Sequence, residues 1–167
     1  AAKAMLDALA DEMGRSAPPL GIMVETPAAA LTAATLGQSA AFFSIGSNDM
    51  TQYALARDRT NPAVAAGLDA LHPAVLSLID ATVRGGAAHD AWTGVCGGMA
   101  AMAEAVPLLI GLGVSELSVP VASLAEIKAM VRTLRIDRCR ALAIRALAAR
   151  DGEAVRALVG TIMEDAA

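Results

Sequence analysis

Short apolar runs alternate with helical patterns along this chain, and that alternation limits its fold more than any other feature. The runs cover residues 20–24, 41–45, 92–95 and 116–119, and a helix-forming pattern follows each of them. Repeated strand–helix units are typical of a parallel sheet with right-handed crossover connections. The sequence therefore predicts an α/β fold with about four such units.

The helical segments are placed by their start and stop signals. Pro27 opens one and Gly37 ends it, Pro107 marks a new first turn, Ser123 with Glu126 forms a capping box, and Asp137 caps a further helix. Helices are expected over residues 3–13, 27–36, 73–84, 99–112, 123–134, 137–149 and 152–164, with a helical turn at 53–57 and an ordered loop at 58–67. The chain then divides into a helix and linker (1–19), the strand–helix units (20–134) and carboxyl-terminal helices (135–167).

Composition excludes several classes of protein. At 167 residues the chain can bury a core, and with only 2% aromatic residues that core must consist of Ala, Leu, Val, Ile and Met. A net charge of -4 and a pI of about 5.1 argue against a nucleic-acid surface, and no basic run or long apolar stretch indicates membrane binding or insertion. Two cysteines in unlike contexts favour a reducing cytoplasm. The start in mid-helix pattern suggests a piece of a longer protein.

Polar residues cluster directly after the second apolar run, in Gly46–Tyr53 and in Asp58-Arg59 behind it. Asn48 offers an amide, Asp49 a hard anionic oxygen, and Arg59 a forked cation that can hold phosphate or carboxylate. The alternative is that Ser-Asn-Asp only caps the next helix. Two other strands end in reactive residues, at Glu25 and Cys96. Because active sites of parallel α/β barrels lie at the carboxyl ends of strands, these residues are candidates for one site.

Each candidate also has a structural interpretation. Glu25 could cap the helix that starts at Pro27, Arg59 could be a solvent-exposed cation, and Cys96 could be a small buried core residue. The two histidines and the second cysteine are given structural roles alone: His72 and His89 are interpreted as turn and loop residues, and Cys139 as a packing residue.

Three motifs together resemble the phosphoenolpyruvate-protein phosphotransferase family, enzyme I of the bacterial sugar phosphotransferase system. They are Gly21-Ile-Met-Val-Glu-Thr-Pro-Ala-Ala29, Phe43-Ser-Ile-Gly-Ser-Asn-Asp-Met-Thr-Gln-Tyr53 with Leu55-Ala-Arg-Asp-Arg59, and Thr93-Gly-Val-Cys-Gly97. The match runs from about residue 20 to about residue 134. It implies the carboxyl-terminal half of a TIM-type (β/α)8 barrel of the phosphoenolpyruvate/pyruvate-binding kind, since a whole barrel needs about 200–250 residues.

The resemblance also implies a site. Glu25 and Asp49 would hold Mg²⁺, Asn48, Asp49 and Arg59 would bind phosphoenolpyruvate (PEP), and Cys96 would donate a proton as pyruvate forms. The phosphoryl group would pass to a histidine in a domain outside this chain, and that domain would meet a phosphocarrier protein. In one place the chain departs from the family, which usually has Glu where Gly98 stands here, and this puts the support of Cys96 in doubt.

Two other functions stay open. One is a Mg²⁺-dependent pyruvate lyase or aldolase built on a related barrel, although such an enzyme would not need Cys96 or Asp58-Arg59. The other is a catalytically incomplete dimerisation or regulatory module. An isolated half-barrel would expose strand edges and apolar faces, so we expect the fragment to form a homodimer. We also expect little PEP turnover, because the resemblance implies that further substrate-binding arginines lie in the other half of the barrel.

Overall fold

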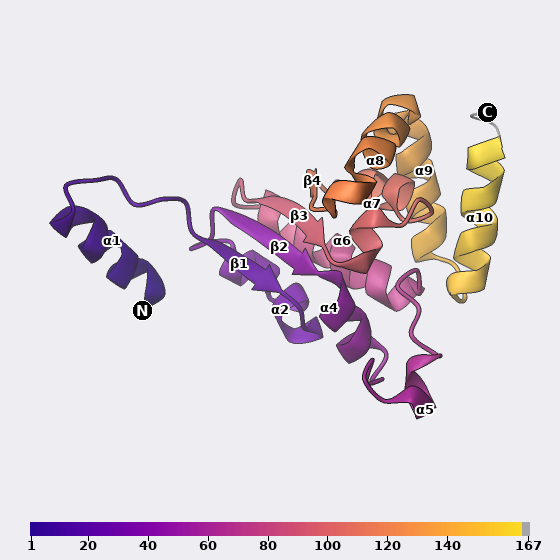
Figure 1. Cartoon of the computed structure of the whole chain (residues 1–167), viewed down its shortest axis with the longest axis horizontal. Coiled ribbons are helices and arrows are strands. Elements are labelled where there is room, and N and C mark those ends of the chain that lie inside the picture. Colours follow the sequence, from indigo (N-terminus) through magenta and orange to yellow (C-terminus); the bar gives the residue numbers. More distant parts are fainter. Residues whose placement is uncertain (165–167) are drawn as a thin grey trace.

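A computed structural model describes residues 1–164, which form a single four-stranded sheet with helices packed against one of its faces (Figure 1). Strands β1 (Gly21–Val24), β2 (Phe42–Gly46), β3 (Trp92–Cys96) and β4 (Glu116–Leu117) lie in this order and pair in parallel. Each strand thus neighbours the next one along the sequence, as expected for successive crossovers. The predicted α/β class and the four strand–helix units are confirmed, although β4 ends two residues before the expected position 119.

The helices follow the strands in sequence. They are α1 (Ala2–Glu12), α2 (Pro27–Leu31), α3 (Ala33–Leu36), α4 (Ser47–Ala54), α5 (Pro62–Ala65), α6 (Pro73–Ala87), the 3₁₀ helix η1 (Gly98–Ala101), α7 (Val106–Leu112), α8 (Val121–Thr133), α9 (Ile136–Leu147) and α10 (Gly152–Glu164). The last helix has the predicted bounds.

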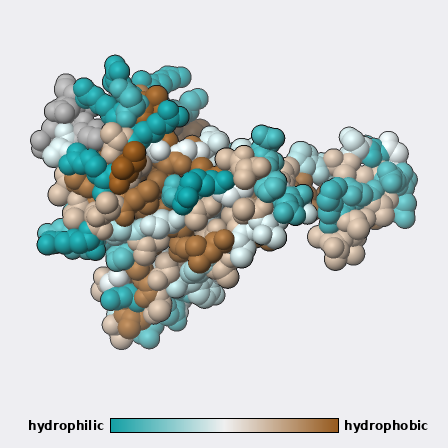
Figure 2. Space-filling model, turned by 180° about the vertical axis from the view of Figure 1, so that it is seen from behind, coloured by the Kyte–Doolittle hydropathy of each residue, from teal (hydrophilic) through white to brown (hydrophobic). Residues whose placement is uncertain are grey.

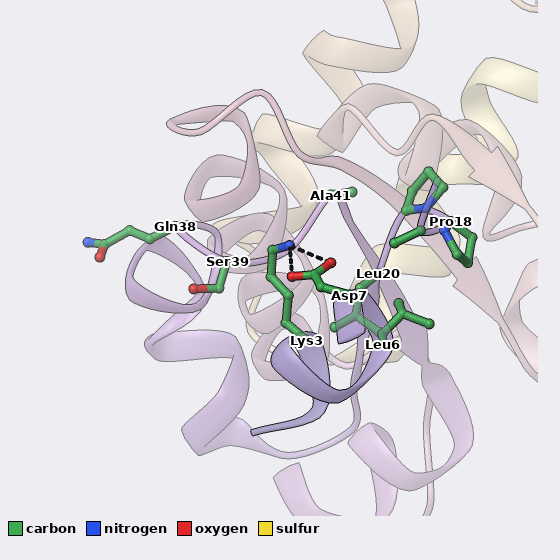
Figure 3. Close-up of a pocket in the computed structure, with 10 residues that line it drawn as sticks. Lys3, Leu6, Asp7, Pro18, Leu20, Gln38, Ser39 and Ala41 are labelled. Atoms are coloured by element: carbon green, nitrogen blue, oxygen red, sulfur yellow. Dashed lines mark hydrogen bonds and ion pairs between the residues drawn. The ribbon is translucent and has the colours of Figure 1, made fainter. Parts of the chain in front are cut away.

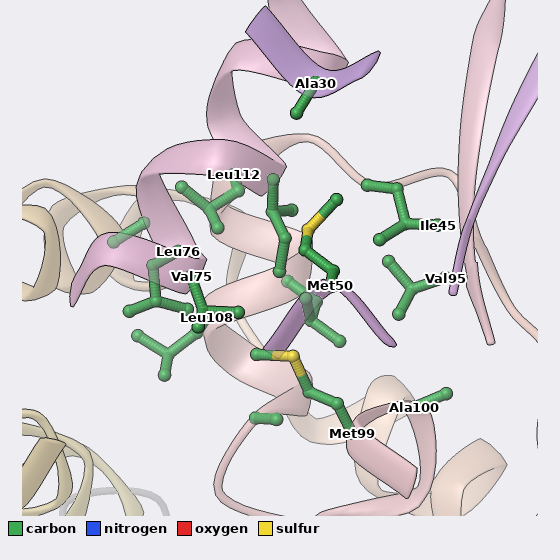
Figure 4. Close-up of a cluster of buried hydrophobic side chains, with 14 of the residues drawn as sticks. Ala30, Ile45, Met50, Val75, Leu76, Val95, Met99, Ala100, Leu108 and Leu112 are labelled. Atoms are coloured by element: carbon green, nitrogen blue, oxygen red, sulfur yellow. The ribbon is translucent and has the colours of Figure 1, made fainter. Parts of the chain in front are cut away.

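One face of the sheet is covered by helices. Helix α6 packs against β2 and β3 and against α2 and α3, while α9 packs mainly against α7 and also contacts α6. Val24, Ile45 and Val95 point from three neighbouring strands into this layer and are almost fully buried. Figure 4 shows Met50 and Met99 between the strand side chains and those of the helices. The expected core of aliphatic residues and methionine is confirmed, with Phe43 as its aromatic member.

The opposite face, here called the open face, carries the alternate residues of the same strands. Met23 is 52% exposed and Trp92 is 42% exposed. The Phe42 ring stacks on Trp92 with 4.7 Å between ring centroids, and it also lies over Gly21, where a Cβ atom would collide with it. Parallel sheets are normally covered on both faces or closed into barrels, so an open apolar face is unusual for an all-parallel sheet.

Several helix boundaries differ from the predictions. The helix expected over 27–36 is divided at Thr32, whose hydroxyl donates to the Ala28 carbonyl at 2.8 Å. The loop expected over 58–67 contains α5, which Asn61 caps by accepting from Ala63 N. The segment 99–112 is split into η1 and α7, and Pro107 lies in the first turn of α7, as predicted.

Helix α6 continues past Gly85-Gly86, where the sequence suggested its end. An added Cβ at Gly85 would lie 2.6 Å from Ala34 N, and one at Gly86 would lie 2.7 Å from Ala91 O. Gly85 therefore allows α3 to pack closely on α6, and Gly86 allows the segment before β3 to do so, rather than either glycine ending the helix. His72 accepts a hydrogen bond from Ala74 N and caps the helix, in agreement with its structural interpretation.

Both predicted caps in the carboxyl-terminal helices are wrong. Helix α8 begins at Val121, two residues earlier than Ser123, and Pro120 takes the capping position. Helix α9 begins at Ile136, and Asp137 pairs with Arg135 at 3.1 Å instead of capping. The prediction for Cys139 is confirmed, since its side chain is fully buried and burial raises the pKa of its thiol.

Helix α1 lies away from the rest of the molecule. Figures 1 and 2 show it as a separate lobe joined by a narrow connection. Met5 and Leu9 on this helix, and Met13 directly after it, are more than half exposed. Gly14, with φ +62°, follows the helix and marks its end as predicted.

Candidate active site

The strands bring three sequence segments to one edge of the sheet, here called the carboxyl edge (residues 25, 46–49 and 96–98). In the register of the sheet Val24 pairs with Ile45, and Gly46 pairs with Cys96. The carboxylate of Glu25 lies across Gly46, where a Cβ atom would come within 2.5 Å of Oε1. Glycine at this position therefore leaves the space that the carboxylate occupies.

Asn48 joins the end of β2 to the turn after β3. Its Oδ1 accepts a hydrogen bond from Gly98 N at 3.0 Å, and the neighbouring Ser47 hydroxyl donates to the Cys96 carbonyl at 2.6 Å. Gly97 between them has φ +86°, and an added Cβ would lie 2.6 Å from Ser47 Oγ. Only glycine combines this conformation with such close contact. The Cys96 turn is thus fastened to the first turn of α4.

The polar residues after β2 were predicted to form a non-helical segment followed by a helical turn at 53–57, and the predicted start of this helix is wrong. Helix α4 starts immediately after β2, so Asn48 and Asp49 already lie in its first turn. Neither caps the helix through its side chain, and Gly46 takes the capping position. Asp49 nevertheless benefits from the positive end of the helix dipole.

Arg59 reaches the carboxyl edge from the loop that follows α4. Its Nη2 lies 3.2 Å from Asp49 Oδ1, and its backbone N donates to Gln52 Oε1 at 3.0 Å. The arginine and aspartate side chains are 45% and 31% exposed, so their ion pair contributes little to stability. The Arg59 guanidinium, being 45% exposed, therefore remains accessible to an anionic ligand.

The residue before Arg59 forms a tight turn, because Asp58 accepts hydrogen bonds from the backbone and the hydroxyl of Thr60. These hydrogen bonds lower the pKa of the Asp58 carboxyl.

Cys96 ends β3 and is half-buried with a free thiol. Its Sγ lies 3.9 Å from the Ser44 hydroxyl, which projects from the same face of β2. Gly98, where the resemblance implies Glu, donates its backbone N–H to Asn48 Oδ1, and an added Cβ would lie 3.3 Å from that oxygen. The backbone at position 98 thus supports Asn48, and as glycine it offers no carboxylate to the thiol.

The donor set suits a hard cation. The capping alternative for Glu25 is excluded, because Thr26 caps α2 by accepting from Ala29 N at 3.3 Å. Glu25 and Asp49 thus remain as carboxylates at one edge of the sheet. Mg²⁺ is usually bound by one or two carboxylates together with water and substrate oxygens. Among residues 1–164, no group of three or more His, Cys, Asp or Glu side chains is placed so that it could hold a metal ion by itself.

A pocket of about 490 Å³ lies beside these residues. This volume falls in the range of small-molecule sites. Its lining residues combine amide, hydroxyl and charged groups with apolar side chains, and they are Asn48, Thr51, Arg59, Leu68, Asp69, Ala70, Met102 and Arg156. Sequence reasoning found Asn48 and Arg59 but missed Asp69 and Arg156, which are 87 positions apart and belong to no local motif.

A second pocket, of about 430 Å³, lies between α1 and the segments that precede β1 and β2 (Figure 3). Its two charged groups neutralise each other, because Lys3 Nζ lies 2.9 Å from Asp7 Oδ2. Leu20 and Ala41 in its wall mark the starts of the strands, which is the edge opposite to the candidate residues. This pocket is therefore separate from the carboxyl edge.

None of the helices in the described residues is long and apolar enough to cross a membrane.

Comparison with known proteins identifies the family. Residues 2–136 match the family described as PEP-utilising enzyme, PEP-binding domain. The chain is 50% identical over 140 residues to a multiphosphoryl transfer protein of Xanthomonas campestris pv. campestris, covering 84% of this chain and 17% of that protein. It is 46% identical over 140 residues to the phosphoenolpyruvate-protein phosphotransferase of Mycoplasma genitalium, covering 84% of this chain and 24% of that protein.

A third relative is the multiphosphoryl transfer protein of Rhodobacter capsulatus, which is 48% identical over 147 residues, or 88% of this chain and 18% of that protein. The chain thus spans a quarter or less of the length of these relatives. The resemblance drawn from the three motifs is confirmed, and the chain belongs to the family of PEP-utilising enzymes, whose PEP-binding domain it matches over most of its length.

Proposed function

We propose that this chain forms the carboxyl-terminal half of a (β/α)8 barrel that binds PEP and Mg²⁺ in a PEP-dependent protein phosphotransferase. The observation that carries the proposal is the joining of Asn48, the Asp49–Arg59 pair and the Cys96 turn at the carboxyl edge. The names of the relatives point to the same reaction class. The open face supports the half-barrel, since closing the sheet with further strands would bury Trp92 and Met23.

Arg59 and Asn48 would bind and orient the substrate. The guanidinium of Arg59 pairs with a phosphate or carboxylate, and the amide nitrogen of Asn48 is available because only its oxygen is used by Gly98. Glu25 and Asp49 would hold Mg²⁺, which when bound neutralises phosphate charge during transfer. Binding the ligand would release Asp49 from Arg59, an exchange made easy by the exposure of that pair.

Cys96 would complete the reaction. Cleavage of the phosphorus–oxygen bond of PEP passes the phosphoryl group to a histidine nitrogen of another domain and leaves the enolate of pyruvate. The Sγ–H of Cys96 then protonates the methylene carbon of this enolate, and the thiolate takes up a proton from solvent afterwards. Ser44, whose hydroxyl lies 3.9 Å from Sγ, can donate to that thiolate. A lyase or aldolase would need neither this thiol nor a histidine acceptor.

The partners of such an enzyme follow from the proposal. The acceptor histidine would itself pass the phosphoryl group to a phosphocarrier protein. Self-association through uncovered sheet edges or helices would give a homodimer, and the free thiols fit a cytoplasmic setting.

The test uses the complete enzyme that contains this chain. Replacement Cys96→Ala should leave PEP binding within about twofold but slow proton incorporation into pyruvate by at least about a hundredfold, because general acid catalysis contributes that much. Cys139→Ala is the matched control, since that thiol is buried in the helix layer. Equal loss of binding and turnover in Cys96→Ala would show a packing role and contradict the proposed function of Cys96.

A further inference from the structure

Helix α10 reaches back to the pocket beside the carboxyl edge through one arginine. Arg156 Nη1 lies 2.9 Å from Asp69 Oδ2, and Nη2 lies 2.8 Å from Asp69 Oδ1, so the pair is bidentate. The first turn of α10 packs directly on the same carboxylate, since an added Cβ at Gly152 would overlap Asp69 Oδ2. The Asp69 carboxylate is therefore held by two residues of α10: Arg156 donates two hydrogen bonds to it, and Gly152 leaves the space for its close approach.

Asp69 also organises the chain around it. Its Oδ1 accepts from Leu71 N at 2.9 Å, and its carbonyl accepts from His72 N at 3.1 Å. The hydrogen bonds from Arg156 are the main cause that lowers the pKa of the Asp69 carboxyl. Asp69 thereby fixes the last turn before α6.

Residues 55–72, here called the Arg59 loop, have two anchors. At the start, Arg59 bonds through its backbone to Gln52 and through its side chain to Asp49. At the end, Asp69 is held by Arg156. Between the anchors the loop is largely exposed. Leu71 is fully buried in the core, so the end of the loop also has an apolar attachment. Loss of the Asp69–Arg156 contact would remove the polar attachment at this end, and the exposed part of the loop that carries Arg59 would be held less firmly.

Arg156 also approaches the segment that follows the Cys96 turn. Its Nε lies 4.0 Å from Glu104 Oε2, so the guanidinium lies between the segments after β2 and β3. It lines the same pocket as Asn48 and Arg59. Yet α10 lies beyond residues 2–136, the part that matches the PEP-binding family. A helix outside the matched region thus contributes to the wall of the candidate site.

We infer that Arg156 is a positioning residue: through Asp69, α10 holds the Arg59 loop so that the Arg59 guanidinium faces its anionic ligand. The identity of that ligand as PEP rests on the proposed function. The anchoring itself does not, because it follows from the bidentate pair and from the packing of Gly152 on Asp69.

The test compares the variants Arg156→Met and Arg156→Lys, made in the whole chain. The control is Arg145→Met, because Arg145 is an exposed residue of α9. Arg156→Met should raise the hydrogen-exchange rates of the Leu71 and His72 amides about fivefold or more, with the exchange of β2 unchanged. Titration with PEP and Mg²⁺, followed by the amide resonances of Asn48 and Arg59, should show at least about threefold weaker binding. Arg156→Lys should restore part of both effects, because a single ammonium retains the charge but loses the bidentate geometry.

The outcomes separate the two claims. Faster exchange throughout the sheet would mean that Arg156 only stabilises the fold, and unchanged exchange at Leu71 and His72 would mean that it anchors nothing; either result overturns the inference. Local loosening with unchanged PEP affinity would overturn the positioning role. If the unsubstituted chain and a complete enzyme that contains it both fail to bind PEP, the proposed function fails, while the exchange rates still decide whether α10 holds the Arg59 loop.

Discussion

The two faces of the sheet differ in how completely they are packed. On the covered face, Phe43 and Ile45 are fully buried beneath α6 and its neighbours. On the open face, Phe42 lies one residue away along β2 and depends on Trp92 and Gly21 for its contacts. The alternation of side chains along a strand thus separates a complete core from a surface that lacks a cover. The carboxyl edge, where the polar residues gather, lies where these two faces meet.

The largest expected effect contrasts the two faces. Phe43→Ala should lower the free energy of unfolding by about 3–5 kcal/mol, because it leaves a cavity in a packed core. Trp92→Ala on the open face should cost only about 1 kcal/mol, the value of an exposed aromatic pair. Urea denaturation of both variants measures the contrast. Similar losses at the two positions would show that the open face is packed as well as the covered one.

Gly97→Ala should destabilise the Cys96 turn by about 1–3 kcal/mol, since alanine is strained at positive φ. The added methyl group would also approach Ser47 and disturb its bond to the Cys96 carbonyl. Gly160→Ala in α10 is the control, because an added Cβ there meets nothing within 4 Å. Thermal unfolding of the two variants is the measurement, and equal melting temperatures would contradict the assigned role of Gly97.

The pair between Asp69 and Arg156 should add a smaller, pH-dependent contribution of about 1 kcal/mol. The pKa of Asp69 lies below its ordinary value of 3.8, so the folded state binds the proton less readily than the unfolded chain. The stabilisation is therefore present above the ordinary pKa and is lost as pH falls through the lower, folded value. Arg156→Met should cost stability at about pH 6, and this cost should shrink as pH falls below 3.8, the ordinary pKa of the Asp69 carboxyl. A difference that does not shrink on acidification would exclude this pair as its source.

The sequence was sufficient for the sheet and for the residues of the carboxyl edge, because both follow from local signals. Apolar runs mark the strands, and polar residues directly after them must meet at one edge of a parallel sheet. Helix limits were predicted less well where tertiary contacts override local signals. Gly85 was interpreted as a stop, although it serves the packing of α6 on α3. The ion pair between Asp69 and Arg156 could not be predicted from the sequence, because it depends on where α10 packs in the folded chain.

The central claim is that the carboxyl edge binds PEP together with Mg²⁺. Its most direct test is calorimetric titration of PEP into the complete enzyme that contains this chain, with and without Mg²⁺. The variants are Arg59→Met, Asp49→Asn and the control Arg84→Met, whose exposed arginine pairs with Asp80 on α6. We predict that Arg59→Met weakens binding at least about tenfold, since the charge-assisted contact to the phosphate or carboxylate of PEP would be lost. Asp49→Asn should abolish the enhancement by Mg²⁺, and Arg84→Met should change neither. Unchanged Mg²⁺-dependent affinity in both Arg59→Met and Asp49→Asn would contradict the account.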